Sequence, residues 1–269
     1  MSIEVHALAS GSSGNSVLIK AGGRGLLIDA GLGPRTLATA VQRRDIGIDQ
    51  LEAVLLTHEH DDHMKGAAAV SKRRRAKVVA NRATLQAVSL RTELANTEEL
   101  QTGSEKEFGA FTVRSFKIEH DAAEPVGYVI QVDGRKITYA TDVGCPTPAL
   151  RAALRGADLC ILESNHDLQW LLRGPYPPHM KARVAGSRGH LSNCAAAAML
   201  AERLDADGPT CIWLAHLSSV NNSPALARRF VTETIKKSTK VSFELDIALR
   251  DRPSVSWIPG YPCGQLSLF

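Results

Sequence analysis

Ala53-Val-Leu-Leu-Thr-His-Glu-His-Asp-Asp-His63 is the most informative stretch of this 269-residue chain. Its first half is an apolar run typical of a buried strand. Its second half places three histidines and two aspartates within six residues. Side chains two apart at the end of a strand point the same way, so His58 and His60 can face one ion. Asp62 and His63 lie where a helix would begin and can face a second ion from the other side.

Imidazole and carboxylate groups at this density favour particular metals. They suit Zn²⁺, Mn²⁺ or iron, whereas Ca²⁺ is bound by oxygen ligands. The alternative interpretation is a polar loop with solvated histidines, but so many ligand-type side chains rarely gather in such a loop. The sequence therefore predicts a divalent metal site on a strand-to-helix loop.

Composition indicates an ordinary globular protein. Hydrophobic residues make up 44% and charged residues 22%, and no apolar run is long enough to cross a bilayer. The first residues lack the basic and apolar regions of a secretory signal. Five cysteines, an odd number without any CxxC pair, predict a reducing compartment and no disulfide framework. We therefore expect a cytoplasmic protein that does not contact the membrane.

Net charge places few limits on the binding partner. Thirty-two basic against 28 acidic residues give a formal charge of +4, far from the excess of a protein that coats nucleic acid. The one dense basic run is Lys72-Arg-Arg-Arg-Ala-Lys77. This run can be a solvated helix end or, because it follows the metal motif closely, a contact for the nucleic acid backbone.

Hydrophobic patterning predicts two packed sheets flanked by helices, an α/β protein with one large domain over residues 1–258. Apolar segments bounded by turn residues predict strands at 3–8, 16–20, 25–29, 53–57, 78–80, 111–118, 126–132, 136–141, 159–163, 210–215 and 241–245. Helical spacing and capping residues predict helices at 34–44, 65–74, 82–94, 193–204 and 224–237. Prolines and glycines in residues 259–264 predict that 259–269 form an extended C-terminal tail.

The pattern H-x-H-x-D-H after an apolar strand resembles the defining motif of the metallo-β-lactamase superfamily. The resemblance spans about residues 3–246 and implies that family's αββα four-layer sandwich, with two mixed sheets flanked by helices. It also implies two divalent ions, with Zn²⁺, Mn²⁺ and iron as the alternatives in this family. The implied ligands of the first ion are His58, His60 and His120, and those of the second are Asp62, His63 and His216, with Asp142 bridging.

Two further positions follow from the same resemblance. Asp29, in Leu-Ile-Asp-Ala-Gly, matches an aspartate that supports the metal ligands from behind. His120 is the one histidine between His63 and Asp142, so it is the sole match to the third ligand motif. It could instead be an exposed loop residue, because some branches of the superfamily alter that motif.

Five motifs narrow the resemblance to the bacterial YycJ/WalJ group, also called VicX, which implies a DNA exonuclease acting from 5′ ends. They are residues 9–16, 163–167, 176–183, 189–193 and 214–218. We take the polar side chains of these motifs as tentative contacts for the substrate: Ser10, Ser12, Ser13, Asn15, Asn165, Lys181 and Arg183. The Ser/Gly loop at 10–16 could equally be an ordinary hairpin connection.

Gly189-His190, before an alanine-rich helix, is similar to the His-Ser-Thr region of tRNA 3′-processing relatives. The likeness implies that Glu163 orients His190 and that His190 assists the leaving group. Asp62 completes the catalytic set that we predict. His190 could also be a polar residue that merely precedes the helix.

The last five residues, Gln265-Leu-Ser-Leu-Phe269, look like the pentapeptide with which bacterial repair and replication proteins bind the sliding clamp. By this likeness Gln265 enters a polar spot, while Leu266, Leu268 and Phe269 supply the apolar contacts. The alternative is a tail that folds back onto the protein's own core.

Three functions are compatible with these patterns. The leading hypothesis is a metal-dependent phosphodiesterase, a 5′-to-3′ DNA exonuclease that uses a water activated by two metals and is linked to DNA replication or repair. A second is a phosphodiesterase or lactonase of small molecules, because the superfamily's metal motif does not select the substrate. A third is a regulatory protein that keeps a structural metal without catalysis.

Overall fold

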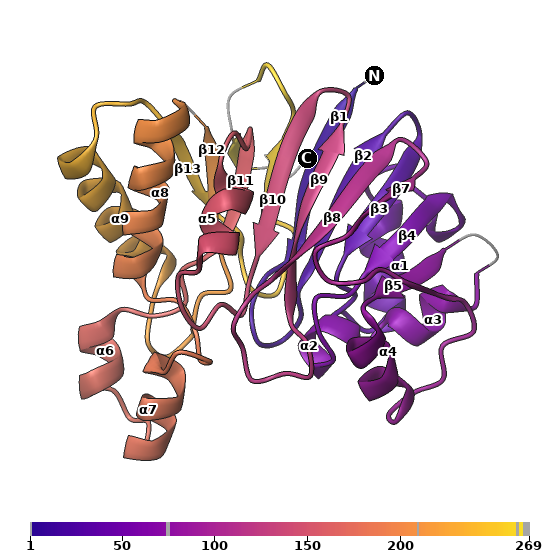
Figure 1. Cartoon of the computed structure of the whole chain (residues 1–269), viewed down its shortest axis with the longest axis horizontal. Helices are drawn as coiled ribbons and strands as arrows, with labels where there is room; N and C mark the ends of the chain where they lie inside the picture. The colour runs from indigo at the N-terminus through magenta and orange to yellow at the C-terminus, as the bar shows by residue number, and fades with distance from the viewer. Residues whose placement is uncertain (1, 74–75, 209, 262–263, 266–269) are drawn as a thin grey trace.

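A computed structural model describes residues 2–73, 76–208, 210–261 and 264–265, and in it two sheets stack face to face (Figure 1). Among these residues the first sheet has eight strands, in the order β15 (Gly264–Gln265), β14 (Val255–Trp257), β1 (Ile3–Ala9), β2 (Ser16–Ala21), β3 (Arg24–Ile28), β4 (Leu51–Leu55), β5 (Lys77–Ala80) and β6 (Thr97–Glu99). The second has seven, in the order β13 (Glu244–Ile247), β12 (Cys211–Ala215), β11 (Leu159–Glu163), β10 (Arg135–Ala140), β9 (Val126–Val132), β8 (Phe111–Lys117) and β7 (Glu105–Phe108).

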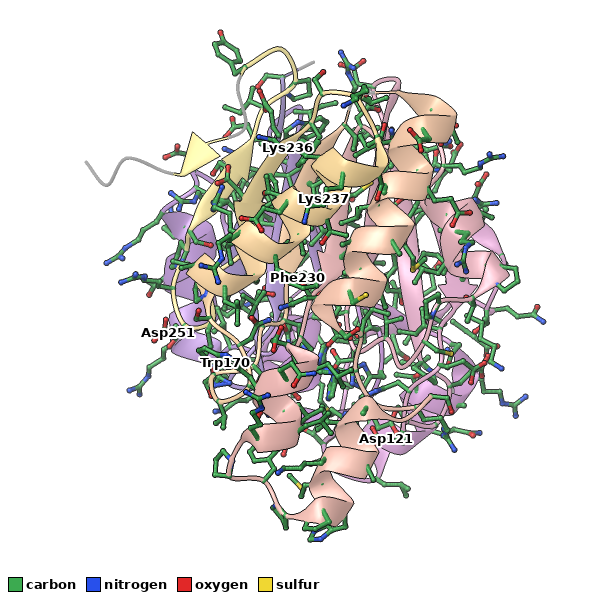
Figure 2. All side chains as sticks on the ribbon, turned by 90° about the vertical axis from the view of Figure 1, so that its left-hand side faces the viewer. Asp121, Trp170, Phe230, Lys236, Lys237 and Asp251 are labelled. Atoms are coloured by element: carbon green, nitrogen blue, oxygen red, sulfur yellow. The ribbon has the colours of Figure 1, made fainter. Side chains whose placement is uncertain are left out.

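Helices cover the outer face of each sheet. On the first sheet lie α1 (Pro34–Gln42), α3 (Ala67–Ser71) and α4 (Arg82–Ser89), with the one-turn α2 (Asp61–Met64) at the lower edge in Figure 1. On the second lie α5 (Pro148–Leu154), α8 (Asn193–Asp207) and α9 (Pro224–Ser238). The short helices α6 (Leu168–Arg173) and α7 (Pro178–Ala185) project below α8 and α9, as Figure 2 shows from the side. The predicted αββα sandwich is confirmed.

Alternation along the strands produces the layers. On β3, Leu26 and Ile28 join the core between the sheets, while Leu27 points to the other face and packs with Leu37 and Val41 of α1. Such strands are apolar on both faces because each face is covered. This is why they appear in the sequence as short continuous apolar runs.

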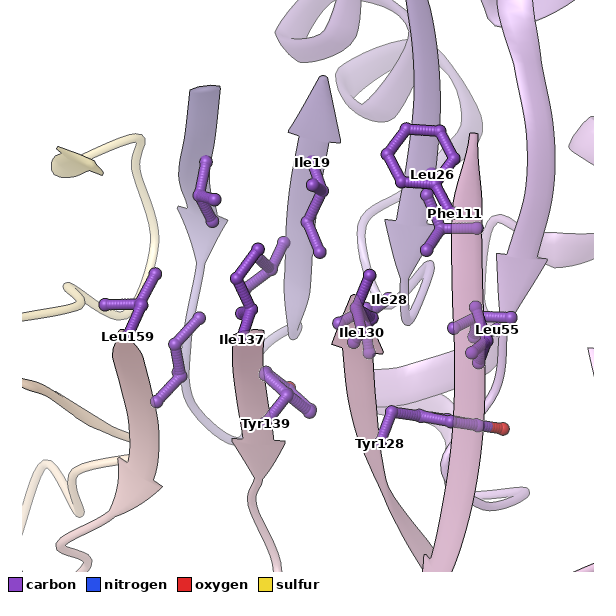
Figure 3. Packing of buried hydrophobic residues seen from close by; sticks show 14 of the residues in the cluster. Ile19, Leu26, Ile28, Leu55, Phe111, Tyr128, Ile130, Ile137, Tyr139 and Leu159 are labelled. Atoms are coloured by element: carbon purple, nitrogen blue, oxygen red, sulfur yellow. The ribbon is translucent and has the colours of Figure 1, made fainter. Parts of the chain in front are cut away.

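The core between the sheets is apolar and fully buried. Ile19, Leu26 and Leu55 from the first sheet face a layer from the second that includes Ile130 and Ile137 (Figure 3). Burying each of these side chains contributes about 1.5–3 kcal/mol. The core therefore fixes the two sheets firmly relative to each other, and with them the loops at their edges.

Parallel pairing brings the strand ends together. Strands β3, β4 and β5 run parallel, as do β10, β11, β12 and β13. Parallel neighbours end at the same edge of a sheet, where ligand sites usually form. The loops after β3, β4, β10, β11 and β12 consequently meet at one edge of the sandwich.

The structure differs from the predicted elements in several places. The predicted helix 65–74 is only α3, at Ala67–Ser71, and the one-turn α2 before it was not predicted. Gly66 precedes α3, and its backbone packs against the carbonyl of Leu32. The predicted strand 241–245 begins only at Glu244, and the predicted helix 82–94 ends at Ser89. Elements β6, β7, β14, α5, α6 and α7 were not predicted, because each is too short to show a clear periodicity.

Two expectations about peripheral features change. Cys211 is disulfide-bonded, so the expectation of a chain without disulfides is wrong at that residue. Lys77 opens β5 opposite Ala53 of the parallel β4, at the sheet edge away from the loop that holds His58. Lys77 therefore lies at the end of the sheet away from the predicted metal site; Arg74 and Arg75 of the basic run lie outside the described residues.

The tail pairs with the first sheet over two residues. Gly264 and Gln265 lie antiparallel to Ser256 and Val255 of β14. The predicted clamp contacts Leu266, Leu268 and Phe269 lie outside the described residues. Of the helices in the part of the chain that the structure covers, none combines the length and the apolarity needed to span a bilayer.

Candidate metal centre

Three predicted site residues follow strands with an unusual backbone. Asp29, Asp142 and His216 adopt φ of 58°, 57° and 53° at the ends of β3, β10 and β12. This left-handed conformation costs a non-glycine residue about 1 kcal/mol or more, although Asp and His tolerate it better than most. Each sharp turn directs a side chain back toward the sheet edge. The strained backbone residues therefore lie where the predicted ligands converge.

The first predicted ligand group is assembled as expected. His58, His60 and His120 place one nitrogen each within 4.8 Å of one another. His58 Nε2 lies 3.0 Å from His60 Nδ1. His120 comes from the loop after β8, and it is 2% exposed, so it is not the exposed loop residue of the alternative interpretation. These three side chains could hold a metal ion.

The second predicted group lies beside the first. Asp62, His63 and His216 also place one ligand atom each within 4.8 Å of one another. Asp62 Oδ2 is 3.5 Å from His63 Nε2 and 3.7 Å from His216 Nε2. Because β4 and β12 belong to different sheets, this group joins the two halves of the sandwich.

Asp142 lies between the two groups. Its Oδ2 is 3.0 Å from His63 Nε2, and its Oδ1 is 3.7 Å from His120 Nε2 and 3.5 Å from His216 Nδ1. One carboxylate therefore reaches nitrogen atoms of both groups. This is the position that a bridging ligand requires.

The rear nitrogen of each buried imidazole is held in place. His63 Nδ1 lies 2.7 Å from Asp29 Oδ2, and His216 Nδ1 lies 2.8 Å from Glu163 Oε1. His120 Nδ1 likewise faces a backbone carbonyl, that of Gly189, at 3.0 Å. Such contacts fix the tautomer and orientation of metal-binding histidines. They leave the other nitrogen of each ring directed at the common centre.

Burial keeps part of the cluster neutral. It is the largest cause that holds the pKa of His58 well below its usual range, with the charge of His63 next. Burial also lowers the pKa of His120. A neutral imidazole offers a lone pair, which is the form that binds a metal.

The second group instead stabilises positive charge. Burial opposes protonation of His216, but Asp142 and hydrogen-bonded carboxylates outweigh it and raise its pKa to about 10. Burial is likewise outweighed at His63, whose pKa Asp29 and Asp142 raise well above the usual range. The buried carboxylates around His63 and His216 favour positive charge at these positions. That charge can be a proton on the imidazole or a bound metal ion.

Two buried atoms provide a direct test of whether a metal fits. Within the described residues, His216 Nε2 and Asp142 Oδ2 are buried without a well-formed hydrogen bond. Their neighbours are other predicted ligands, Asp62 Oδ2 at 3.7 Å and His63 Nε2 at 3.0 Å. Leaving such atoms unpaired costs about 1–3 kcal/mol each. Both are metal-binding atoms, and both point at the cluster. The donor set of nitrogen and carboxylate oxygen therefore fits a divalent ion of the zinc or manganese type.

Glu163 and His190 form the predicted pair. Glu163 Oε1 lies 2.9 Å from His190 Nδ1, and Oε2 accepts hydrogen bonds from the backbone N–H groups of Val143 and Leu191. Burial opposes protonation of His190, but the charge and hydrogen bond of Glu163 outweigh it and raise its pKa. The His190 side chain retains 16% exposure, so it is the more accessible member of the pair.

Three of the tentative substrate contacts have another role in this geometry. Asn15 is fully buried, and its Nδ2 donates to Asp62 Oδ2 at 3.2 Å. Ser10 Oγ accepts from His216 N at 2.8 Å, and Asn165 Nδ2 donates to His216 O at 2.9 Å. These buried groups position predicted metal ligands.

The other four tentative contacts lie nearer the surface. Ser12 and Ser13 are exposed at the tip of the loop between β1 and β2. Lys181 Nζ donates to the carbonyl of Leu172, and Arg183 pairs with Asp121 beside α7 (Figure 2). The two serines are free to meet a ligand, whereas the two basic residues mainly attach α7 to its surroundings.

Thr57 is a site residue that sequence reasoning did not single out. Its Oγ1 lies 3.0 Å from His58 Nδ1 and 3.1 Å from His63 Nδ1, and it donates to Asp29 at 3.0 Å. A hydroxyl directly before the first histidine was the available signal. One side chain thus orients both histidines and their supporting carboxylate.

Sequence comparisons agree with this geometry. The chain matches the beta-lactamase superfamily domain over residues 24–212. It is 34% identical over 240 residues to the exodeoxyribonuclease YycJ of Bacillus anthracis, covering 88% of this chain and 90% of that protein. It is 33% identical over 225 residues to the exodeoxyribonuclease WalJ of Streptococcus pneumoniae, covering 82% and 83%.

Solved structures share the fold. The metallo-β-lactamase fold protein YhfI from Bacillus subtilis matches with a TM-score of 0.70 at 18% identity, covering 96% of this chain and 99% of that one. Zn²⁺-bound PqqB from Methylobacterium extorquens matches with a TM-score of 0.64 at 17% identity, covering 93% and 99%. From the family match and the two sequence relatives, we conclude that this chain belongs to the metallo-β-lactamase superfamily, in the group of the YycJ and WalJ exodeoxyribonucleases.

Proposed function

We propose that this protein is a metal-dependent phosphodiesterase that degrades DNA from 5′ ends, a 5′-to-3′ exonuclease. The observation that carries the proposal is the convergence of seven predicted ligands at one edge of the sandwich. The names of the relatives, which align over most of their length, support DNA as the substrate. No comparable observation favours a small-molecule phosphodiesterase or lactonase, or a regulatory protein without catalysis.

We assign two divalent ions, Zn²⁺ or Mn²⁺, to this centre. His58, His60 and His120 would hold one ion, and the other would be held by Asp62, His63 and His216, with Asp142 shared. The support is that each group of three offers ligand atoms within 4.8 Å of one another, with Asp142 next to both. Asp29 would orient His63 from behind, at 2.7 Å.

We assign separate catalytic roles to the bound ions and to the side chains around them. Two bound ions would supply a hydroxide nucleophile at neutral pH and neutralise charge on the phosphoryl oxygens. Asp62, whose side chain is 21% exposed, would orient the attacking water and accept its proton. His190, held by Glu163, would give a proton to the leaving oxygen.

Hydrolysis of end-labelled duplex DNA tests the proposal. We expect a 5′ label to be released before a 3′ label when Mn²⁺ is present, and neither to be released when a chelator is added. RNA and bis(p-nitrophenyl) phosphate are the competing substrates. Turnover of the small phosphodiester without any cleavage of DNA would favour the small-molecule alternative instead.

We also propose that the enzyme acts in the cytoplasm in DNA replication or repair, and that Gln265, Leu266, Leu268 and Phe269 bind the sliding clamp. The support is the sequence Q-L-S-L-F at the end of the chain. Deleting Leu268 and Phe269 should abolish clamp binding in a pull-down while leaving hydrolysis of short duplexes unchanged. An intact protein that does not bind the clamp would remove this part of the proposal.

A further inference from the structure

One cavity shares wall residues with the surroundings of the predicted metal ligand His216, and no function assigned above uses it. Its volume is about 340 Å³, and it lies between the loop after His216, the start of α9 and residues 247–252. Ser10 belongs to the wall of the cavity and also touches the centre, because its Oγ accepts a hydrogen bond from His216 N at 2.8 Å. The cavity is therefore one residue away from the predicted ligand His216, since Leu217 also lines it.

The wall of this cavity has two chemical parts. Leu217, Ile247 and Leu249 form an apolar surface, and Arg250 and Arg252 stand at the rim together with serine hydroxyls. Asp251, the one acidic residue of the lining, is exposed at the molecular surface (Figure 2). A ligand with a flat apolar part and an anionic group matches this combination.

Arg250 is placed to serve both the cavity and the centre. Its Cγ lies 3.0 Å from where a Cβ on Gly11 would be, so the side chain runs along the backbone of that loop. Gly11 N donates to Asn15 Oδ1 at 2.8 Å, and Asn15 Nδ2 reaches Asp62 Oδ2 at 3.2 Å. Arg250 is therefore separated from the predicted ligand Asp62 by two intervening residues.

One N–H of the Arg250 guanidinium has no partner within the described protein. Its Nε is buried without a hydrogen-bond partner in the part of the chain that the structure describes. A buried guanidinium N–H normally has a partner, and phosphate oxygens suit its planar donor geometry.

We propose that this cavity binds the nucleotide adjoining the phosphodiester that is cleaved, with Arg250 contacting its phosphate and Leu217 and Ile247 contacting its sugar and base. The proposal rests on the proposed nuclease function, which places the scissile phosphate at the neighbouring centre. The volume suits one nucleotide, so the strand end would enter one residue at a time. Arg250 is then a substrate-binding residue outside the metal ligand set.

Binding of single nucleotides and nucleosides tests the cavity separately from catalysis. Calorimetric titration of the full-length, metal-loaded protein with dAMP should give saturable binding, weakened at least tenfold in Arg250→Gln because a charge-assisted hydrogen bond is lost. Deoxyadenosine has no phosphate, so its weaker binding should not change in Arg250→Gln. Ser219→Trp, which fills the mouth of the cavity, should abolish binding of both compounds.

The matched control is Arg135→Gln, which removes an arginine at the opposite end of β10 and should bind dAMP like the wild type. Circular dichroism of each variant checks that it is folded. Equal dAMP affinity in Arg250→Gln and the wild type, unchanged binding in Ser219→Trp, or no binding by the wild type would overturn the proposal. Hydrolysis of labelled DNA by the wild type, measured in parallel, tests the nuclease function independently.

Discussion

Individual side chains at the centre are fixed by contacts on the side away from the cluster. Asp29 holds His63, Glu163 holds His216, and the carbonyl of Gly189 faces His120. Each contact leaves one ring nitrogen directed inward, so the geometry exists before any metal arrives. This preorganisation reduces the cost of ordering flexible side chains when the ion binds.

The shared carboxylate is the most sensitive residue. We expect Asp142→Asn to lose bound divalent metal and to slow DNA hydrolysis by on the order of a thousandfold, because a neutral amide removes charge that both ligand groups use. Metal content after dialysis and the rate of nucleotide release measure the two effects. Asp205→Asn, at an exposed position on α8, is the matched control and should retain both properties. Wild-type metal content in Asp142→Asn would contradict the bridging assignment.

Glu163 is expected to act through the two histidines that it contacts. In Glu163→Gln the metal affinity should fall by about 10–100-fold, the usual effect of losing such a supporting contact. At saturating metal, the alkaline limb of the pH–rate profile should move to lower pH, because the charge of Glu163 raises the pKa of His190. A lowered rate with an unshifted profile would mean that His190 is not the proton donor.

The sequence predicted the site residues that form a dense motif of metal-binding side chains. It did not predict site residues that reach the centre only through contacts between distant parts of the chain. His58, His60, Asp62 and His63 follow one another, and their density is itself the signal. Arg250 reaches the same region only because residues 247–252 fold against the loop after β1. No local pattern around it marks such a role.

At the scale of elements, the strand ends determine the site. Apolar runs that end in Asp or His predicted β3, β4, β10 and β12 together with the side chains that follow them. Short elements such as β6 and β7 were missed, because three or four polar residues at a sheet edge have no detectable periodicity. The positive φ at Asp142 and His216 was also invisible in the sequence, since tertiary packing imposes it.

Two loops approach each other so closely at Gly31 that we expect no larger residue to be tolerated there. A Cβ on Gly31, in the loop after β3, would lie 1.7 Å from the carbonyl oxygen of Asp62. Gly31→Ala must push the two loops apart, so we expect a loss of about 2 kcal/mol in the free energy of unfolding and a strong loss of activity. Urea denaturation and the DNA assay measure these losses. Gly23→Ala, at a position with open space, controls for the added methyl group, although its positive φ adds a smaller strain. Full activity in Gly31→Ala would show that Asp62 can move without consequence.

The pairing of β1 with β14 predicts a dependence of stability on pH. Burial, and then the charge of Arg44, lower the pKa of His6 to about 4, and His6 Nδ1 lies 2.6 Å from Ser256 Oγ on β14. The pKa of histidine in the unfolded chain is about 6.5. The neutral, buried His6 therefore makes its full contribution to the free energy of unfolding above that pH. The contribution is lost as pH falls toward 4, by up to about 3 kcal/mol.

Replacing His6 isolates that contribution. The free energy of unfolding of His6→Gln, measured in urea at pH 7 and at pH 4.5, should change less between the two values than that of the wild type. An identical change in both proteins would assign the acid sensitivity to other groups, such as the buried carboxylates of the metal centre.

At the scale of the whole molecule, the centre joins the two halves of the sandwich. His58 and His63 come from the first sheet, and Asp142 and His216 come from the second. An ion bound between them would stabilise the packing of one sheet on the other, because binding to the folded state alone raises its stability. Catalysis and the architecture of the protein therefore depend on the same contacts.

The most direct measurement is the hydrolysis of 5′-labelled DNA by protein stripped of metal and then supplied with Mn²⁺ or Zn²⁺. If the converging side chains hold catalytic metal, the stripped protein should release no label, and one of these ions should restore release in the wild type but not in Asp142→Asn. Undiminished release by the stripped protein, or equal restoration in the variant, would contradict the account.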